Sequence, residues 1–336
     1  MVSLEILLTG LRAAGERTRL RLLFLLSHGE LNVKELTQIL GQSQPRVSRH
    51  LKLLCEAGLL ERHREGSWVL FRLADTGVPG ALARLIVDLM PPASAEVQRD
   101  LRRLEEVRKA RDVAAAEYFK ANAREWDKIR SLHVAEEEVE NTILAAVGGG
   151  PVGTLLDLGT GTGRLLELLA DRIDQGTGID SSHAMLAIAR ANLERSGLAH
   201  CQVRHGDLFH LPYDNGSMDL ITVHQVLHYL DDPGRALQEA ARVLRAEGRM
   251  LIVDFAPHEL EFLRENHAHR RLGIEDDQMR LWLDKAGLKV QSHQMLPHRD
   301  GGLGEGITVS IWLVQSTGQS VGAKAVADAA LKGDIE

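Results

Sequence analysis

The stretch from Thr154 to Leu166 limits what this chain can fold into more than any other part of the sequence. A short apolar run ends in Asp157 and Leu158, three glycines then alternate with threonines, and a leucine-rich segment with helical spacing follows. This order predicts a β-strand, a tight turn and the N-terminus of an α-helix. Glycine at every second position lets the backbone turn at positive φ, and the helix end offers unpaired N–H groups. The stretch therefore predicts a ligand-binding turn in an α/β fold.

Two kinds of ligand suit such a turn. A dinucleotide site has the pattern G-x-G-x-x-G, and its third glycine would fall at position 164, which is an arginine here. The spacing Asp157-x-Gly159-x-Gly161-x-Gly163 instead resembles the first motif of the class I S-adenosylmethionine (SAM)-dependent methyltransferases. This resemblance implies a Rossmann-like α/β domain with a mainly parallel seven-stranded sheet, and SAM as its cofactor.

Later segments follow in the order of that family. A second strand ends in Asp180, about twenty residues beyond the glycines, where an acidic side chain accepts both ribose hydroxyls. Segment 203–208 is similar to the end of that family's third strand, and segment 219–224 to its fourth strand. Segment 242–255 is similar to the helix, turn and fifth strand that follow. The resemblance implies that Asp207 and Leu208 bind the adenine. The expected cofactor-binding residues are Asp157, Gly159, Thr160, Gly161, Gly163, Asp180, Ser181, Met185, Asp207, Leu208 and His224.

Length and charge divide the chain. Its 336 residues favour two domains over one. The net charge of −7 is unevenly spread, because residues 1–75 hold 11 Lys and Arg against 8 Asp and Glu. That part therefore carries about +3 and the rest about −10. The asymmetry indicates a nucleic-acid partner for the front of the chain.

The front of the chain has the pattern of a small DNA-binding domain. Helices are predicted over 4–14, 18–27, 31–40 and 45–57, followed by a hairpin of two β-rich runs, 59–64 and 67–73. In the fourth helix Val47, Leu51 and Leu54 lie at helical spacing and form the buried stripe, which leaves basic residues on the other faces. This order predicts an α+β winged helix-turn-helix, whose recognition helix enters the major groove of DNA.

Three segments, 17–23, 47–54 and 64–68, resemble the ArsR-type bacterial repressors, and the likeness covers nearly all of residues 4–74. It implies operator DNA as a partner and a homodimer. The dimer would use the first helix and the apolar stripe of the helix 82–90, although that stripe could simply pack on its own domain. The expected DNA-binding residues are Ser43, Gln44, Arg46, Ser48, Arg49, His50, Lys52 and Arg64.

No metal site is expected. Many ArsR-type repressors sense metals through a cysteine pair on the third helix, but residues 31–35 contain no cysteine. The only cysteines, Cys55 and Cys201, cannot form a disulfide framework and fit a reducing cytoplasm. His258, His267 and His269 lack a defined carboxylate or thiolate set, so substrate contacts, a helix that shields the methyl group, or a solvated helix are favoured there over a metal.

The sequence predicts four segments, residues 1–90, 91–116, 117–315 and 316–336. The second of these segments would be an exposed helical connector and the last a flexible tail. The spacing of Tyr118 and Trp126 resembles the N-terminal helices that cover the SAM pocket in ubiquinone- and menaquinone-type methyltransferases. Packing on the domain is the alternative. No apolar run reaches the ~18 residues of a membrane span, so we expect a cytoplasmic protein.

The sequence thus predicts an ArsR-type transcriptional regulator that carries a SAM-dependent methyltransferase acting on a small molecule. The alternative is a catalytically silent repressor whose operator affinity is tuned by SAM or S-adenosylhomocysteine. Methyl transfer depends mainly on alignment, and His228 or Tyr118 are candidate bases only if the acceptor must lose a proton. Methylation of DNA amino groups is disfavoured, because residues 223–226 lack an Asn/Asp-Pro-Pro-Tyr-like motif.

Overall fold

The computed structural model describes residues 4–65, 68–74, 77–126, 136–297 and 306–317, apart from a few side chains in the hairpin and at position 112. The chain forms two compact units, residues 1–115 and 116–336, and each is described by itself. The predicted tail beyond residue 317 and the segment 127–135 lie outside the described residues.

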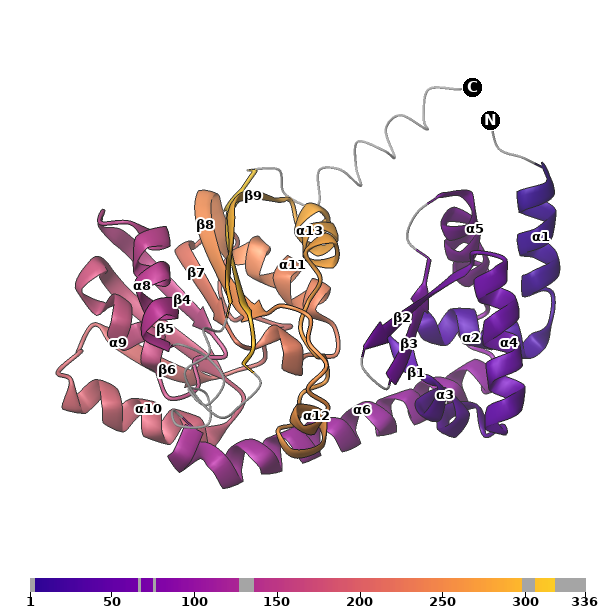
Figure 1. Cartoon of the computed structure of the whole chain (residues 1–336), viewed down its shortest axis with the longest axis horizontal. Coiled ribbons are helices and arrows are strands. Elements are labelled where there is room, and N and C mark those ends of the chain that lie inside the picture. Colours follow the sequence, from indigo (N-terminus) through magenta and orange to yellow (C-terminus); the bar gives the residue numbers. More distant parts are fainter. Residues whose placement is uncertain (1–3, 66–67, 75–76, 127–135, 298–305, 318–336) are drawn as a thin grey trace. The chain divides into compact units, whose positions relative to one another are not determined.

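Unit 1 is a winged helix-turn-helix, as predicted. Its three-stranded antiparallel sheet has the order β1-β3-β2, and its helices enclose a leucine-rich core. The elements are α1 (Leu4–Ala14), α2 (Arg17–Leu26), β1 (Leu31–Asn32), α3 (Val33–Leu40), α4 (Gln44–Glu56), β2 (Leu60–Glu65), β3 (Trp68–Leu73), α5 (Gly77–Asp88) and the first part of α6 (Ala95–Asn122) (Figure 1).

The turn between α3 and α4 follows from local sequence. Asn32 and Glu35 form a capping box at the start of α3, and Gly41 ends the helix at a φ of 64°. Ser43 is the N-cap residue of α4, although its side chain makes no capping hydrogen bond. The predicted stripe of Val47, Leu51 and Leu54 is buried in the core, which leaves the polar faces of α4 outside.

The predicted exposed connector is instead part of unit 1. Val97, Leu104 and Val107 of α6 are buried there. Asp100 is buried too, and its carboxylate accepts hydrogen bonds from Arg21 Nε at 2.6 Å and Nη2 at 2.7 Å. The charge-rich sequence suggested exposure, but one of its carboxylates forms a buried ion pair. Unit 1 therefore extends to residue 115 instead of ending near residue 90.

Unit 2 is the predicted Rossmann-like domain. Its seven-stranded sheet has the order β6-β5-β4-β7-β8-β10-β9, and all pairs from β6 to β8 are parallel while β10 runs antiparallel to both neighbours. Its elements are η1 (Ala123–Glu125), α8 (Glu136–Val147), β4 (Val152–Leu158), α9 (Arg164–Leu169), η2 (Ala170–Arg172), β5 (Ile173–Asp180), α10 (His183–Arg195), β6 (Cys201–His205), β7 (Met218–His224), η3 (Leu227–Tyr229), α11 (Pro233–Val243), β8 (Leu244–Phe255), α12 (Phe262–Asn266), α13 (Asp276–Lys285), β9 (Leu288–Leu296) and β10 (Val309–Ser316) (Figure 1).

The sheet is buried on both faces, as strand alternation shows. Leu155 packs with α8, α9 and α10, whereas the next residue, Leu156, packs with α11 and α13. Because β5, β4 and β7 are parallel neighbours, their carboxyl ends meet at one edge. Ligands of open α/β sheets bind at this kind of edge, near the point where the strand order reverses. None of the helices in the described ranges has both the length and the apolar character that a membrane crossing requires.

Candidate cofactor cavity and DNA-binding surface

The glycine turn after β4 has the backbone that the sequence predicted. Gly159, Gly161 and Gly163 all have positive φ, at 69°, 53° and 84°. A Cβ atom on Gly159 would lie 2.4 Å from Cγ2 of Val226, so a side chain there would collide with the neighbouring segment. The N–H of Gly159 donates to the carbonyl of Ile179 at 2.8 Å, which fixes the turn to β5.

Asp180, at the end of β5, is fixed against this turn. Its Oδ2 accepts from the N–H of Gly161 at 2.9 Å, and its Oδ1 accepts from the N–H of Ser182 at 2.8 Å. Burial raises the pKa of Asp180, and these two backbone hydrogen bonds act against that rise. Each oxygen of a carboxylate can accept a further hydrogen bond. Asp180 therefore presents two oriented acceptors.

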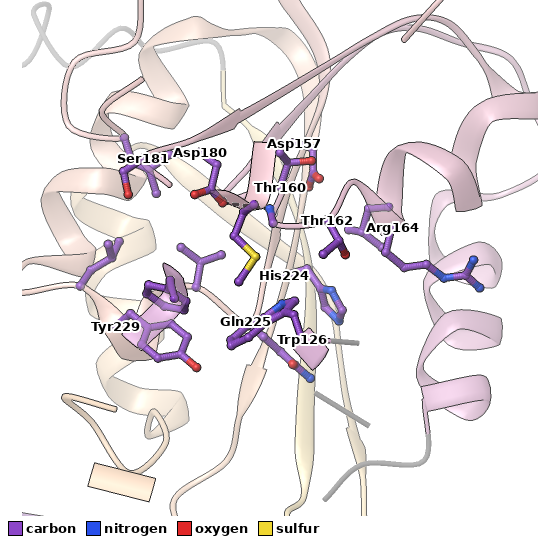
Figure 2. Close-up of a pocket in the computed structure, with 18 residues that line it drawn as sticks. Trp126, Asp157, Thr160, Thr162, Arg164, Asp180, Ser181, His224, Gln225 and Tyr229 are labelled. Atoms are coloured by element: carbon purple, nitrogen blue, oxygen red, sulfur yellow. Dashed lines mark hydrogen bonds between the residues drawn. The ribbon is translucent and has the colours of Figure 1, made fainter. Parts of the chain in front are cut away.

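A cavity of about 120 Å³ lies at this edge of the sheet (Figure 2). Nine of the predicted cofactor residues line the cavity, and Gly163 and Asp207 do not. Those nine are Asp157, Gly159, Thr160, Gly161, Asp180, Ser181, Met185, Leu208 and His224.

Two of the predicted residues, Asp157 and Gly163, make contacts that hold the strands and the glycine turn in place. Asp157 is buried, and its Oδ1 accepts from the hydroxyl of Thr222 at 2.6 Å, which joins β4 to β7. Gly163 is the N-cap residue of α9, and its N–H donates to the carbonyl of Thr160 at 2.8 Å. Gly163 therefore shapes the turn from outside the cavity.

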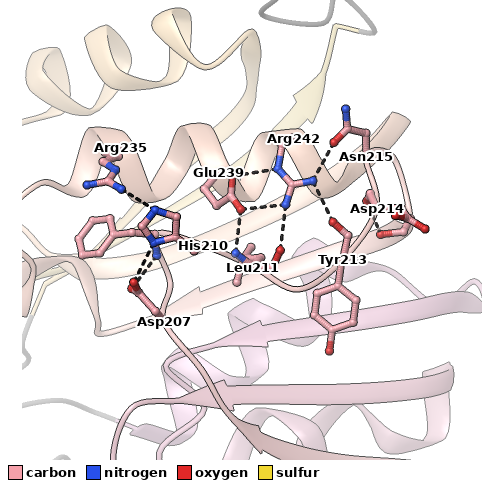
Figure 3. Close-up of polar contacts among 11 residues, drawn as sticks. Asp207, His210, Leu211, Tyr213, Asp214, Asn215, Arg235, Glu239 and Arg242 are labelled. Carbon is pink, nitrogen blue, oxygen red and sulfur yellow. Dashed lines mark hydrogen bonds and ion pairs between the residues drawn. The ribbon is translucent and has the colours of Figure 1, made fainter.

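Asp207 lies on the loop after β6 and has an exposed side chain. Its carboxylate accepts from the N–H of Phe209 at 2.9 Å and lies 3.0 Å from Nδ1 of His210. Nε2 of His210 lies 2.9 Å from Nη2 of Arg235 (Figure 3). A guanidinium can only donate, so His210 accepts at Nε2 and donates from Nδ1 to Asp207. In the structure Asp207 shapes the loop that carries Leu208, and its contact with adenine stays a prediction.

Arg242 of α11 holds the rest of this loop. Its Nη1 donates to the carbonyl of Tyr213 at 2.8 Å and to Asn215 Oδ1 at 2.7 Å, while Nη2 donates to the carbonyl of Leu211 at 3.0 Å. Glu239 orients Arg242 and also accepts from the N–H of Leu211 at 2.7 Å (Figure 3). The loop beside the cavity therefore has a fixed shape.

The other end of the cavity is aromatic. Phe119 of α6, Trp126 and Tyr229 line it, and the centroid of the Phe119 ring lies 5.3 Å from that of Trp126 and 4.9 Å from that of Tyr229. Trp126 lines the cavity, and its role as a lid over a bound cofactor stays a prediction. Tyr118 does not line the cavity, and its hydroxyl lies 2.8 Å from Nδ1 of His267. Burial raises the pKa of Tyr118 to about 12, so it is a phenol at neutral pH.

Neither candidate base reaches the cavity. His228 is almost fully buried, and its Nδ1 lies 2.7 Å from Oδ1 of the buried Asp254. Asp254 also accepts from the N–H of Leu227 at 2.9 Å, so the pair holds η3 in place. The cavity is also lined by residues that were not among the expected cofactor-binding ones, namely Phe119, Thr162, Arg164, Leu165, Gln225, Val226, Tyr229 and Leu230; the sequence indicated the segment 225–230 at the mouth of the site but singled out none of its residues as cofactor-binding. Phe119 could have been found from the sequence, because it is an aromatic residue next to Tyr118.

The histidine-containing segment after β8 is mostly irregular. Only α12 is helical, and the alternative of a solvated helix does not describe the segment, because His269 and Arg271 are buried. The N–H groups of Arg270 and Arg271 donate to the carbonyl of His228 at 3.0 and 3.1 Å, which ties the segment to η3. Across the described ranges, no three His, Cys, Asp or Glu side chains are grouped so as to hold a metal ion.

The recognition-helix surface of unit 1 is basic and exposed. Most of the predicted DNA-binding residues are exposed, namely Ser43, Gln44, Arg46, Ser48, Arg49 and Lys52. His50 is turned inward, with Nδ1 3.6 Å from Oε2 of Glu16, and burial lowers its pKa. The side chain of Arg64 lies outside the described residues. The apolar stripe predicted over residues 82–90 is only partly buried: Leu82 is buried, whereas Leu85 and Leu89 are 60% and 83% exposed.

The two units together define a class of protein: a winged helix-turn-helix regulator joined to a domain with the class I methyltransferase fold. Residues 16–62 match the family model for bacterial regulatory proteins of the arsR family, and residues 156–252 match the methyltransferase domain. The chain is 42% identical over 90 residues to the arsenical resistance operon repressor of Escherichia coli K12, covering 26% of this chain and 76% of the repressor. The chain belongs to the arsR family of bacterial regulatory proteins and carries a methyltransferase domain.

Relatives of unit 2 match only in part. The uncharacterized methyltransferase YcgJ of Bacillus subtilis is 30% identical over 118 residues, which are 34% of this chain and 47% of YcgJ. The chain therefore spans about half the length of that relative. A Haloferax volcanii methyltransferase, solved in complex with the Trm112 methyltransferase activator, superposes with a TM-score of 0.50 at 22% identity. It covers 59% of this chain and 96% of its own, and the likeness shows the fold.

Proposed function

We propose that this protein is a DNA-binding transcriptional regulator whose second unit binds SAM and transfers its methyl group to a small molecule. The observation that carries the proposal is the Asp180 carboxylate, which two backbone N–H groups hold at the bare glycine turn of the cavity. An acidic side chain at this strand end is suited to the paired hydroxyls of a ribose.

The residues around Asp180 fit SAM better than a dinucleotide. Met185 and Leu208 give the ribose end apolar walls for an adenine. Gly161 leaves its backbone bare, and Nε1 of Trp126 lies 3.5 Å from the place where a Cβ would stand. The third glycine of a dinucleotide turn would fall at position 164, but Arg164 stands there and is paired with Glu140, with Nε and Nη2 each 2.6 Å from a carboxylate oxygen.

The chain's own part in methyl transfer would be to position and to exclude water. SAM supplies a methyl group on a sulfonium, whose leaving group is a neutral thioether. Phe119, Trp126 and Tyr229 would close the cavity over the acceptor, and the glycine turn would fix the donor. Alignment of two reactants in this way supplies much of the rate enhancement of such a reaction.

DNA binding would use the exposed face of α4. Arg46, Arg49 and Lys52 carry the charges that neutralise phosphates and reach base edges in the major groove. The exposed leucines of α1 and α5, Leu4, Leu85 and Leu89, favour a homodimer, which would place two such helices on neighbouring half-sites. Operator binding would locate the protein in the cytoplasm.

One observation also favours regulation by SAM or S-adenosylhomocysteine without turnover. Helix α6 contributes Val97 and Leu104 to the core of unit 1 and Phe119 to the cavity of unit 2. A ligand that moves Phe119 would therefore act on a helix that belongs to both units. Such regulation needs only a difference in ligand affinity between two states of the protein.

Titration calorimetry of the full-length protein tests the cofactor assignment. We expect saturable one-site binding of SAM and none of NAD. Binding of NAD, or no heat with SAM, would contradict the proposal. Operator binding is then measured on a duplex that the wild-type protein selects from a random pool, with SAM, with S-adenosylhomocysteine and with neither. Equal affinity in all three samples would exclude the regulatory candidate.

A further inference from the structure

Gln225, the residue after β7, has an unusual backbone conformation. Its φ is +55°, in the left-handed region, and the residue is 9% exposed. Glycine, asparagine and aspartate adopt this region most readily, and a residue with a longer side chain is strained there. Strain of this kind persists only where the surrounding structure holds it, and it occurs often in functional sites.

The strain at Gln225 is maintained by a hydrogen bond from the neighbouring strand. Its N–H donates to the carbonyl of Val253 in β8 at 2.7 Å, which continues the pairing of β7 and β8 beyond His224. The chain then turns into η3, and the side chain of Gln225 lines the cavity (Figure 2). The figure shows it beside Trp126, away from the Asp180 end.

Gln225 is 9% exposed and lines the cavity, and its side-chain amide makes no hydrogen bond with the residues that the structure describes. Its amide atoms are not among the fully enclosed unpaired ones, so they are open to the cavity. Glu247 offers a comparison within the chain, because it also has a positive φ, of 62°, but it is exposed on a turn and its carboxylate accepts from Nε2 of Gln315 at 2.8 Å. A ligand in the cavity can therefore form a hydrogen bond with the Gln225 amide without displacing a protein partner.

The surroundings of the amide are neutral. Tyr229 is buried, which raises its pKa well above 10 and keeps it a phenol. Its hydroxyl lies 3.4 Å from Nε2 of His269, whose pKa burial lowers well below its usual range, so that imidazole is neutral at pH 7. The charged groups that line the cavity, Asp157, Arg164 and Asp180, already have the partners described above.

We propose that Gln225 determines specificity in the methyl-acceptor subsite. The acceptor is an uncharged, planar aromatic molecule with a hydrogen-bonding heteroatom. Its ring lies against Phe119, Trp126 and Tyr229, and its heteroatom pairs with the Gln225 amide. An amide donates and accepts, so it pairs with a hydroxyl, a carbonyl or a ring nitrogen. A carboxylate or an ammonium would lack a counter-charge in this subsite. The inference rests on the proposed function, because the acceptor must meet the methyl group of SAM beside the glycine turn.

Three naphthalene probes of equal ring size test the inference on full-length protein that is saturated with S-adenosylhomocysteine. They are 2-naphthol, which is neutral, 2-naphthoate, which is an anion, and 2-naphthylmethylammonium, which is a cation. Binding is followed by probe fluorescence and calorimetry. We expect 2-naphthol to bind about tenfold more tightly than either charged probe, the factor that one unpaired hydrogen-bonding group commonly costs.

Gln225→Gly is the decisive variant, because glycine accepts the positive φ and removes the side chain that carries the amide. We expect it to lose about tenfold in 2-naphthol affinity, with SAM affinity within about twofold of wild type and an unchanged or higher Tm. Glu247→Gly is the matched control: the same replacement at a positive φ outside the cavity should leave 2-naphthol binding unchanged. Gln225→Glu should shift the preference to the cationic probe.

Three results would overturn the inference: no binding of 2-naphthol to wild type, equal binding to the Gln225→Gly variant, or tightest binding of a charged probe. SAM titration of the same samples separates this failure from that of the proposed function. If wild type does not bind SAM, the proposed function fails. If it binds SAM but 2-naphthol binding does not depend on Gln225, only the acceptor assignment fails.

Discussion

The two units use charge in opposite ways. In unit 1 the charges assigned to function are exposed on α4, and the best-buried ion pair, Arg21–Asp100, holds the fold together. In unit 2 the groups assigned to function, Asp180 and Gln225, lie in a cavity, while the network around Arg242 that shapes the nearby loop is at least partly exposed. A surface for a large polyanion must remain hydrated until it binds, whereas a small-molecule site gains strength and specificity from excluding water.

Asp100→Ala should give the largest effect on stability. It leaves Arg21 with its side chain 10% exposed and without its bidentate partner. Removal of one member of a buried ion pair typically costs about 3–5 kcal/mol. Urea unfolding of the full-length protein, followed by circular dichroism, measures the loss for the transition of unit 1. Glu56→Ala is the control, because Glu56 pairs with Lys52 on the surface, both side chains are exposed, and the loss should be at most about 1 kcal/mol. Equal losses for both variants would show that burial does not distinguish the two pairs.

Asp180→Ala should give the next largest effect, on SAM binding. Hydrogen bonds to a charged group contribute about 1.5–3 kcal/mol, so calorimetry should show a loss of roughly tenfold to 150-fold in affinity. Asp174→Ala is the matched control, because Asp174 lies on the same strand with an exposed side chain. Unchanged SAM affinity in the Asp180 variant would remove Asp180 from the pocket assignment.

Arg49→Ala should weaken DNA binding by less. The loss of one phosphate contact should lower affinity several-fold at physiological salt and reduce the slope of log K against log salt by about 1. Mobility shifts on the selected duplex, at several salt concentrations, measure both quantities. Arg99→Ala, on the exposed side of α6, should change neither. A slope identical to that of wild type would exclude Arg49 from the contact set.

The smallest predicted effect is a dependence of stability on pH. Burial lowers the pKa of His267 and, more strongly, of His269, whereas in the unfolded chain both groups have a pKa near 6.5. The unfolded state therefore binds more protons below about pH 6.5, and unit 2 should lose stability as the pH falls through that value. Thermal unfolding between pH 8 and pH 5 measures this, and His269→Phe should flatten the dependence. A Tm that rises on acidification would contradict the sign.

Much of the fold followed from the sequence because its local signals agreed. The glycine turn, the acidic strand end at Asp180 and the stripe of Val47, Leu51 and Leu54 each gave the element that the structure contains. These are short-range patterns, in which periodicity and backbone freedom determine the outcome.

The parts that failed depend on tertiary contacts. The charges of α6 predicted an exposed connector, because no local pattern reveals that Asp100 pairs with Arg21 far away in the sequence. His228 was a candidate base, but its Nδ1 lies 2.7 Å from Oδ1 of the buried Asp254, far away in the sequence. The segment 225–230 was expected at the mouth of the site, but the conformation of Gln225 was not, because a positive φ at glutamine is imposed by its neighbours and no propensity predicts it.

Helix α6 also decides where the polypeptide can be cut. A fragment that ends at the proline pair near residue 90 would lack Val97, Asp100 and Leu104, and would expose the apolar surface that they cover. An independently folding DNA-binding fragment must therefore reach about residue 115, in the middle of a helix. Limited proteolysis should therefore spare the first part of α6. Gene fusions that replace unit 2 should join within this helix.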